Sequence, residues 1–314
     1  MKTSFNISIL GGRGYVGQEI IKIINNHPNF FISDIYSKTS QGKLVDDYTK
    51  SKSLTYKLLD SPDKLDFTDI DIVIMALPNN ESSKYIKNIE KYDSNIIIID
   101  ISADYRFDDG WAYKLPELAA PSSDKRISNP GCYASAIQFS LLPIKHLING
   151  RVSCMGISGY SGAGASPNDK NDPRNLEGNI IPYSLSGHIH EKEVIKHCYK
   201  EISFSPHVAN FFRGILVTSH IQLTKKASSR QICELYKSFY SDKKLIRVIE
   251  EIPMINKVSN SHYVYIGGFE VDESGYSLTV CCTLDNLLKG AATQVIQNLN
   301  NACSLNELTG INYE

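Results

Sequence analysis

A glycine-rich turn near the N-terminus separates a strand pattern from a helix pattern. Residues 6–10 are mostly apolar and predict a short strand, and apolar residues recur at helical spacing over residues 16–24. Between them, Gly11, Gly14 and Gly17 have the spacing Gly-x-x-Gly-x-x-Gly. Such glycines allow a tight turn and let the backbone approach a pyrophosphate, which helix N–H groups can hold. The unit therefore predicts a dinucleotide site, with an ordinary glycine turn as the alternative.

Strands and helices continue to alternate through the first half of the chain. Residues 30–36, 71–79 and 96–102 contain buried strand patterns, and residues 81–90 predict a polar crossover helix. Strands that are apolar throughout and alternate with helices form a parallel sheet covered on both faces. We therefore expect an α/β Rossmann domain, in which ligands bind at the carboxyl ends of the strands.

Candidate ligand residues follow the third and fourth of these strands. Pro78 ends one strand, and Arg106 lies just beyond the next. Because carboxyl ends of parallel strands share one edge of the sheet, both are expected near the site. Arg106 is a candidate anion ligand, and a surface ion pair with Asp104 or Asp108 explains it equally well.

The loop after the second strand indicates which dinucleotide binds. An NAD-selective site carries an acid about twenty residues past the glycines to hold the ribose 2′-hydroxyl. Ser37 and Lys38 occupy that place here. A hydroxyl and a cation suit a 2′-phosphate, so we expect NADP(H) as the cofactor. Asp34 lies near enough to keep NAD as the alternative, and a solvated polar loop is a further one.

The second half of the chain has a different pattern. Residues 152–158, 215–223, 262–269 and 277–283 predict strands with few helices between them. This order of elements predicts an α+β second domain with a mostly antiparallel sheet. A final helix with an apolar stripe is expected over residues 287–303.

Cys132 follows a Pro-Gly turn and precedes an apolar helical stretch. The run from Ser128 to Ala136 predicts a loop that opens into a helix, with the cysteine in its first turn. Unpaired N–H groups and the positive end of the helix dipole favour a thiolate there. Cys132 is therefore a candidate nucleophile, and a small buried apolar side chain is the alternative.

Two histidines lie in the segment that opens another predicted helix. His188 and His190 are two residues apart, so on a helix they point in different directions and would rarely bind one metal ion. A general acid/base is the better functional interpretation, with Glu191 or Glu193 orienting one imidazole. A capping or surface role is the alternative.

The second half offers two further ligand candidates. Ser161 and Gly162 belong to a glycine- and hydroxyl-rich loop whose N–H groups can lie against cofactor or substrate. Arg213 precedes a predicted strand and is a candidate ligand for a substrate carboxylate.

Composition limits the kinds of partner. The 314 residues have a net charge of −1 and are 42% hydrophobic, which indicates neither a nucleic-acid surface nor a membrane surface. The seven cysteines form no Cys-x-x-Cys pair, as expected of reduced thiols and not of a zinc site. A strand begins almost at the N-terminus and leaves no room for a targeting peptide. We expect a cytoplasmic protein without a metal centre.

Seven segments, in order and over nearly the whole length, carry a family pattern. They are GGRGYVG (11–17), SADYRFDDGW (102–111), SNPGCYA (128–134), SGYSGAG (158–164), GHIHEKE (187–193), NFFRGI (210–215) and DNLLKGAATQVIQNLN (285–300). With them the chain resembles the N-acetyl-γ-glutamyl-phosphate reductases of arginine biosynthesis. These enzymes belong to the aspartate-semialdehyde dehydrogenase-like superfamily.

The resemblance implies a fold and a reaction. Residues 1–130 with 286–314 would form the NADP-binding Rossmann domain, to which the C-terminal helix returns, and residues 131–285 the catalytic and dimerisation domain. NADPH would reduce N-acetyl-glutamyl 5-phosphate to N-acetyl-glutamate 5-semialdehyde through a thioester on Cys132. His190 or His188 would be the acid/base, and the choice between them stays open. The protein would be a homodimer or homotetramer.

The same resemblance implies sets of ligand residues. The cofactor would contact Gly11, Arg13, Gly14, Tyr15, Val16, Gly17, Ser37, Lys38, Pro78, Ser161, Gly162 and Asn286. The acyl-phosphate substrate would contact Arg106, Asn129 and Arg213. Two other functions remain open: an aspartate-semialdehyde dehydrogenase, and a relative that binds dinucleotide without catalysis.

Overall fold

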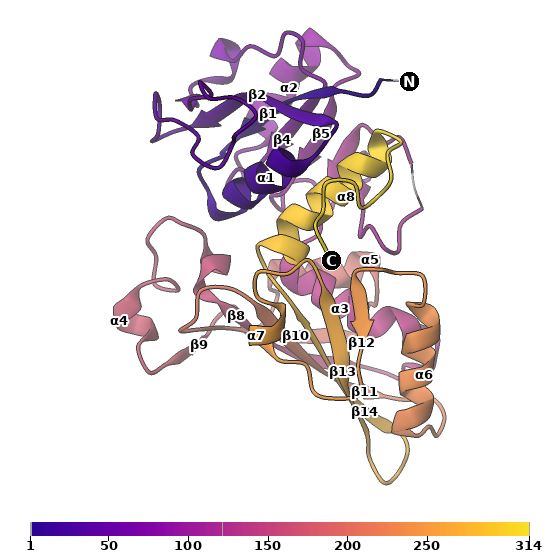
Figure 1. Cartoon of the computed structure of the whole chain (residues 1–314). Coiled ribbons are helices and arrows are strands. Elements are labelled where there is room, and N and C mark those ends of the chain that lie inside the picture. Colours follow the sequence, from indigo (N-terminus) through magenta and orange to yellow (C-terminus); the bar gives the residue numbers. More distant parts are fainter. Residues whose placement is uncertain (1, 121, 314) are drawn as a thin grey trace. The chain divides into compact units, whose positions relative to one another are not determined.

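The computed structural model describes residues 2–120 and 122–313, and residue contacts divide the chain into two units (Figure 1). The first unit combines residues 1–130 with 291–312, and the second comprises residues 131–290 with the last two residues. From the sequence we expect the chain to return to the first unit at residue 286, whereas residue contacts place this return at residue 291.

The first unit contains a seven-stranded parallel sheet in the order β3-β2-β1-β4-β5-β7-β6. Its strands are β1 (Phe5–Leu10), β2 (Phe30–Ser37), β3 (Lys57–Leu58), β4 (Ile72–Met75), β5 (Ile97–Asp100), β6 (Ala112–Tyr113) and β7 (Arg126–Ser128). Its helices are α1 (Tyr15–Asn26), the 3-10 turn Pro62–Lys64, α2 (Ser83–Tyr92) and α8 (Thr293–Ala302). The predicted Rossmann architecture is confirmed. The three short strands β3, β6 and β7 were not predicted.

Apolar strands and amphipathic helices build the core of this unit. All four residues of β4 are buried, because helices cover both faces of a parallel sheet. Helix α1 buries the side chains of Ile20, Ile21 and Ile24, which recur at helical spacing. Helix α8 packs beside α1 and β5, so the C-terminal helix returns to the first unit as expected.

The expected helix over residues 287–303 is not one regular α-helix. Residues Leu288–Ala292 are π-helical, and α8 begins only at Thr293. The Gly290 N–H donates to the Asp285 carbonyl oxygen at 2.8 Å, five residues back, which is the π spacing. The wider turn separates the end of the last strand from α8.

The second unit contains a mixed sheet in the order β12-β13-β14-β11-β8-β10-β9. Its strands are β8 (Val152–Gly159), β9 (Ile180–Pro182), β10 (Ile202–Ala209), β11 (Ile215–Gln222), β12 (Ile246–Val248), β13 (Val264–Val271) and β14 (Ser277–Leu284). Its helices are α3 (Cys132–Leu141), α4 (Pro173–Leu176), α5 (Ile189–His197), α6 (Ser229–Phe239) and α7 (Ile255–Val258), with 3-10 turns at Leu142–Leu147 and Tyr160–Ala163. Two strand pairs, β8–β10 and β12–β13, are parallel and the others antiparallel, so the mostly antiparallel prediction is confirmed.

Helices α3, α5 and α6 pack on one face of this sheet. Side chains alternate along β8, so Cys154 is buried while Met155 is 43% exposed on the other face. Six elements of this unit were not predicted: β9, β10, β12, α4, α6 and α7. Pro206 interrupts the strand pattern of β10, and proline removes a donor from a ladder. No helix long and apolar enough to cross a membrane occurs among the described residues.

Candidate active site

Cys132 is the first residue of α3, as predicted from the Pro-Gly turn before it. Gly131 is the N-cap, in extended conformation, and its carbonyl oxygen accepts the Ser135 N–H at 2.8 Å. The Gly131 N–H donates to the buried Glu193 carboxylate at 2.7 Å. Cys132 itself is half-buried, while the remaining residues of α3 are buried. The thiol thus lies at the positive end of a fixed helix.

Both predicted histidines lie close to Tyr133, the residue that follows Cys132. His188 caps α5, and its Nδ1 accepts the His190 backbone N–H at 3.1 Å. The ring of Tyr133 lies 6.4 Å from that of His188 and 6.0 Å from that of His190. The two imidazoles are 4.9 Å apart. The structure therefore brings the predicted nucleophile and both acid/base candidates to neighbouring helices, without selecting one histidine.

Tyr133 keeps its proton in this cluster. Burial and the neighbouring Tyr183 and Cys132 hold the pKa of Tyr133 well above its ordinary value of 10.0. Its hydroxyl donates to the carbonyl oxygen of His207 at 2.7 Å. Tyr133 thus acts as a fixed neutral spacer between the two helices.

The carboxylates predicted to orient an imidazole also hold backbone groups. Glu191 accepts the Gly187 N–H at 3.0 Å with one oxygen and the Phe204 N–H at 2.8 Å with the other. Its carboxylate therefore fixes the start of α5 to β10, and its predicted role in orienting an imidazole stays a prediction. Glu193 has the additional contact to Gly131 that joins α5 to α3.

The glycine- and hydroxyl-rich loop lies beside Asn286. The Ser161 hydroxyl accepts a hydrogen bond from Asn286 Nδ2 at 2.9 Å. A Cβ at Gly162 would lie 3.0 Å from the Ser158 hydroxyl and 3.8 Å from the Asn286 amide. Three predicted cofactor residues, Ser161, Gly162 and Asn286, are therefore grouped within the second unit.

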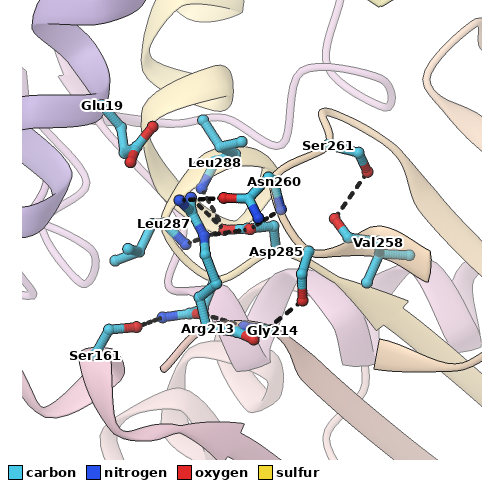
Figure 2. A network of polar contacts seen from close by, with 12 residues as sticks. Glu19, Ser161, Arg213, Gly214, Val258, Asn260, Ser261, Asp285, Leu287 and Leu288 are labelled. Atoms are coloured by element: carbon cyan, nitrogen blue, oxygen red, sulfur yellow. Dashed lines mark hydrogen bonds and ion pairs between the residues drawn. The ribbon is translucent and has the colours of Figure 1, made fainter. Parts of the chain in front are cut away.

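Arg213, the predicted carboxylate ligand, is paired with a carboxylate of the protein (Figure 2). Its Nε and Nη2 donate to the fully buried Asp285 at 2.6 and 3.0 Å. Its Nη1 donates to Asn260 Oδ1 at 2.9 Å. The sequence analysis missed Asp285, although it is the acid that directly follows the last apolar strand. The substrate role of Arg213 stays a prediction.

The glycine turn of the first unit fits a dinucleotide pyrophosphate. Gly11 has a φ of 87°, and a Cβ there would lie 2.2 Å from the Ala76 carbonyl oxygen. At Gly14 the nearest atom to a Cβ would be 3.5 Å away, so the backbone is open to a ligand at this point. Helix α1 begins at Tyr15 without a side-chain cap, and its described first turn carries no acid. These features leave the helix N-terminus suited to an anion.

Arg13 and the end of β2 form the neighbouring part of this unit. Arg13 Nη1 donates to the Thr39 hydroxyl at 3.2 Å. The exposed Lys38 lies 3.4 Å from Glu81. Asp34, the acid that makes NAD the alternative cofactor, forms an ion pair with Lys57.

Arg106 is buried, with 7% of its surface exposed. Its Nε donates to the Asn129 carbonyl oxygen at 2.9 Å, and Nη2 donates to the Ile101 carbonyl oxygen at 2.7 Å. Asp104, one acid considered as its partner, accepts the N–H groups of Asn80 and Ser82 at 2.6 and 3.0 Å. No cluster of metal-binding side chains occurs within residues 2–120 and 122–313.

Family models match both units. Residues 6–125 match the semialdehyde dehydrogenase NAD-binding domain, and residues 132–286 match the semialdehyde dehydrogenase dimerisation domain. The first unit is thus a domain that binds a nicotinamide dinucleotide.

Solved structures share the fold. Aspartate semialdehyde dehydrogenase II of Vibrio cholerae has a TM-score of 0.79 at 17% identity, covering 96% of this chain and 98% of that one. The Candida albicans aspartate semialdehyde dehydrogenase solved with NADP has a TM-score of 0.71 at 16% identity, with coverage of 96% and 98%.

Curated relatives are much closer in sequence. "Protein arg-6, mitochondrial" of Neurospora crassa is 44% identical over 97% of this chain, which spans only 36% of that longer protein. The N-acetyl-γ-glutamyl-phosphate reductase of Stenotrophomonas maltophilia is 40% identical over 98% of both chains. That of Xanthomonas axonopodis is 41% identical over 97% of this chain and 98% of its own length. The chain therefore belongs to the N-acetyl-γ-glutamyl-phosphate reductase family.

Proposed function

We propose that the chain reduces N-acetyl-glutamyl 5-phosphate to N-acetyl-glutamate 5-semialdehyde and phosphate, with NADPH and a Cys132 thioester. The observation that carries this proposal is the position of Cys132 at the start of α3, where the ring of the next residue, Tyr133, lies against both histidines at the start of α5. Relatives that match over nearly their whole length are named for this reaction.

Cys132 performs the first chemical step. Its thiolate attacks the acyl carbonyl carbon, the bond to the phosphate oxygen breaks, and phosphate leaves with that electron pair. The product is a thioester on Cys132, which keeps the acyl group from hydrolysing to the free acid. Backbone N–H groups at the start of α3 favour the negative oxygen that forms during attack.

The second step returns the thiolate. NADPH, when bound, supplies the hydride that reduces the thioester carbonyl. Collapse of the resulting thiohemiacetal breaks the carbon–sulfur bond and releases the aldehyde. A histidine, His190 or His188, exchanges the proton on the reacting oxygen, an effect typically worth about 10²–10⁴-fold in rate.

Charged residues support the substrate assignment to different degrees. Arg106 stays our candidate ligand for the leaving phosphate, because it follows the carboxyl end of β5 and its Nε contacts the carbonyl oxygen of Asn129, three residues before Cys132. Asn129 stays a candidate substrate ligand, because it lies three residues before Cys132 in the sequence. The Arg213 charge is already balanced by Asp285, which weakens the case for a substrate carboxylate there.

NADP is the proposed cofactor in preference to NAD. Arg13 and Lys38 offer positive charge near the end of β2, and the Lys57 ion pair occupies Asp34. Lys38→Ala should weaken NADPH binding about 10–100-fold and leave NADH binding within about twofold, because the charged hydrogen bond to a 2′-phosphate is lost. Lys84→Ala is the matched control, since Lys84 also pairs with Glu81. Equal losses for both dinucleotides would contradict the assignment.

We also propose that the protein forms a homodimer or homotetramer. The contact would use the face of the second unit's sheet that lies opposite α3, α5 and α6. Met155 and Cys281 lie on either side of Thr218 on this face, and Met155 is 43% exposed. The match to a dimerisation domain supports the proposal. Met155→Glu should lower the mass measured by light scattering to that of a monomer. Met254→Glu, at an exposed residue outside the strands, should not change it.

A cytoplasmic location is also proposed. None of the seven cysteines, all of which lie in the described part of the chain, forms a disulfide bond, as is usual in proteins of reducing compartments. Cell fractionation that recovers the protein with a mitochondrial marker would contradict this location.

The reverse reaction tests the proposed function. N-acetyl-glutamate 5-semialdehyde and phosphate are mixed with NADP or NAD, and absorbance of the reduced nicotinamide is followed. Phosphate-dependent reduction of NADP is expected. Faster turnover of aspartate semialdehyde would assign the chain to the other activity, and dinucleotide binding without turnover of either aldehyde would indicate a non-catalytic relative.

A further inference from the structure

Asp285 is the centre of a buried network at the end of β14 (Figure 2). Its two oxygens accept hydrogen bonds from Arg213 Nε and Nη2 and from the backbone N–H groups of Asn260, Leu287 and Leu288, at 2.6, 3.0, 2.7, 2.9 and 3.0 Å. The parallel pair of bonds from Arg213 fixes the plane of the carboxylate. One side chain therefore anchors the start of the following π-helical turn.

Asn286 makes a second anchor directly beside the first. Its Oδ1 accepts the Gly214 N–H at 2.7 Å, and its Nδ2 donates to the Ser161 hydroxyl at 2.9 Å. Adjacent side chains, Asp285 and Asn286, thus hold adjacent residues, Arg213 and Gly214. Residues 285–290, hereafter the 285–290 turn, are consequently fixed at their first two positions to the two residues that precede β11.

The last residue of the 285–290 turn lies against the candidate nucleophile. A Cβ at Gly290 would lie 2.7 Å from Cys132 Cβ and 3.1 Å from Leu284 Cδ1. Gly290 is tied back to Asp285 by its N–H···O bond of 2.8 Å. The backbone at residue 290 is therefore packed on Cys132 with no room for a side chain.

We propose that the 285–290 turn is the support that fixes the Cys132 thiol, and that Arg213 acts as a positioning residue through Asp285. The proposal rests on the proposed function, in which Cys132 is the nucleophile. Glu193 fixes the backbone before Cys132, and Gly290 packs against the Cβ of Cys132. A turn held by a buried ion pair cannot move away without breaking that pair.

Direct substrate binding by Arg213 predicts a different outcome. Three of its nitrogens already donate to Asp285 and Asn260, and its charge has a buried counter-ion. A substrate carboxylate bound by Arg213 would mainly affect KM. A positioning role affects kcat and the intrinsic reactivity of Cys132, which can be measured without substrate.

The experiment compares Arg213→Lys, Asp285→Asn and Gly290→Ala with the wild type. Asp272→Asn is the matched control, because Asp272 also accepts backbone N–H groups but lies before β14, whereas Asp285 follows it. The kinetic constants of the reverse reaction are measured, together with the rate of Cys132 alkylation by iodoacetamide. The tryptic peptide from Ile127 to Lys145 reports that rate, since Cys132 is its only cysteine.

We expect kcat to fall about 100-fold in Gly290→Ala, the loss typical of a displacement near 1 Å, and about tenfold in Arg213→Lys and Asp285→Asn, with KM within about threefold. Alkylation of Cys132 should change by more than about fivefold in the same variants, and Asp272→Asn should match the wild type. If the added methyl group prevents folding of Gly290→Ala, the other two variants decide, because they add no atom next to Cys132.

Wild-type alkylation rates in folded Arg213→Lys and Asp285→Asn, with only KM raised, would overturn the proposal. Failure of the proposed function is a separate result. It would appear as an active Cys132→Ser enzyme, whereas the alkylation measurement needs no turnover.

Discussion

His27 predicts how the first unit responds to acid. Its ring is fully buried and stacks on Phe30 at 3.9 Å. Nδ1 accepts the N–H groups of Asn29 and Phe30 at 3.1 and 3.2 Å, so it carries no hydrogen, and Nε2 lies 2.9 Å from Asn300 Oδ1. A proton on Nδ1 would make this nitrogen a donor that faces the N–H groups of Asn29 and Phe30, so both hydrogen bonds would be lost. Burial is the main cause that lowers the pKa of His27 to about 4, and the charge of Lys50 lowers it further, whereas the hydrogen bond that Asn300 Oδ1 accepts acts in the opposite direction.

This lowered pKa determines how the stability of the first unit depends on pH. The unfolded chain binds the His27 proton near pH 6.5, whereas the folded unit binds it only near pH 4. Stability is therefore fully present above pH 6.5 and is lost as the pH falls from 6.5 toward 4. At 1.36 kcal/mol per pH unit, the free energy of unfolding falls by up to about 3.4 kcal/mol. About 2.5 kcal/mol of this is already lost at pH 4.5.

Urea unfolding followed by tryptophan fluorescence measures this loss. Trp111 is the only tryptophan and belongs to the first unit, so its signal reports that unit. The wild type should lose about 2.5 kcal/mol more between pH 7.5 and 4.5 than His27→Asn, whose amide oxygen replaces the Nδ1 acceptor and does not titrate. His262, whose pKa burial also lowers to about 4, lies in the second unit. Equal losses in the wild type and the variant would refute the reasoning.

Three further predictions concern single contacts. Gly11→Ala should abolish NADPH binding in fluorescence titration, because its Cβ would lie 2.2 Å from a carbonyl oxygen and its φ is positive. Glu193→Ala should lower the free energy of unfolding by about 1–3 kcal/mol in urea, since it removes the buried acceptor of the Gly131 N–H, while Glu193→Gln should lower it less. Ser228→Ala should cost about 1 kcal/mol by removing the capping box of α6, and Ser238→Ala in the same helix should cost under about 0.5 kcal/mol.

Local signals in the sequence predicted the elements that carry the candidate site. The Pro-Gly step before Cys132 determines where α3 begins, and the glycine turn before Tyr15 determines the start of α1. These signals lie within a few residues, so they are visible without the fold. The capping pair of α6, Ser228 and Gln231, is a local signal of the same kind, although α6 was not among the predicted helices.

Contacts between distant segments could not be predicted in the same way. The pairing of Arg213 with Asp285 depends on the register of β11 and β14, in which Ile215 faces Leu284. The packing of Gly290 on Cys132 depends on how the π-helical turn leaves the sheet. One glycine and one arginine in a sequence do not indicate such partners.

The central claim is that Cys132 carries the acyl group during turnover. The most direct test mixes the enzyme with N-acetyl-glutamate 5-semialdehyde and NADP in the absence of phosphate, so that the thioester accumulates. The account predicts a burst of about one NADPH per active site, and an acyl adduct on the peptide from Ile127 to Lys145. An adduct on another peptide, or an undiminished burst in Cys132→Ser, would contradict it.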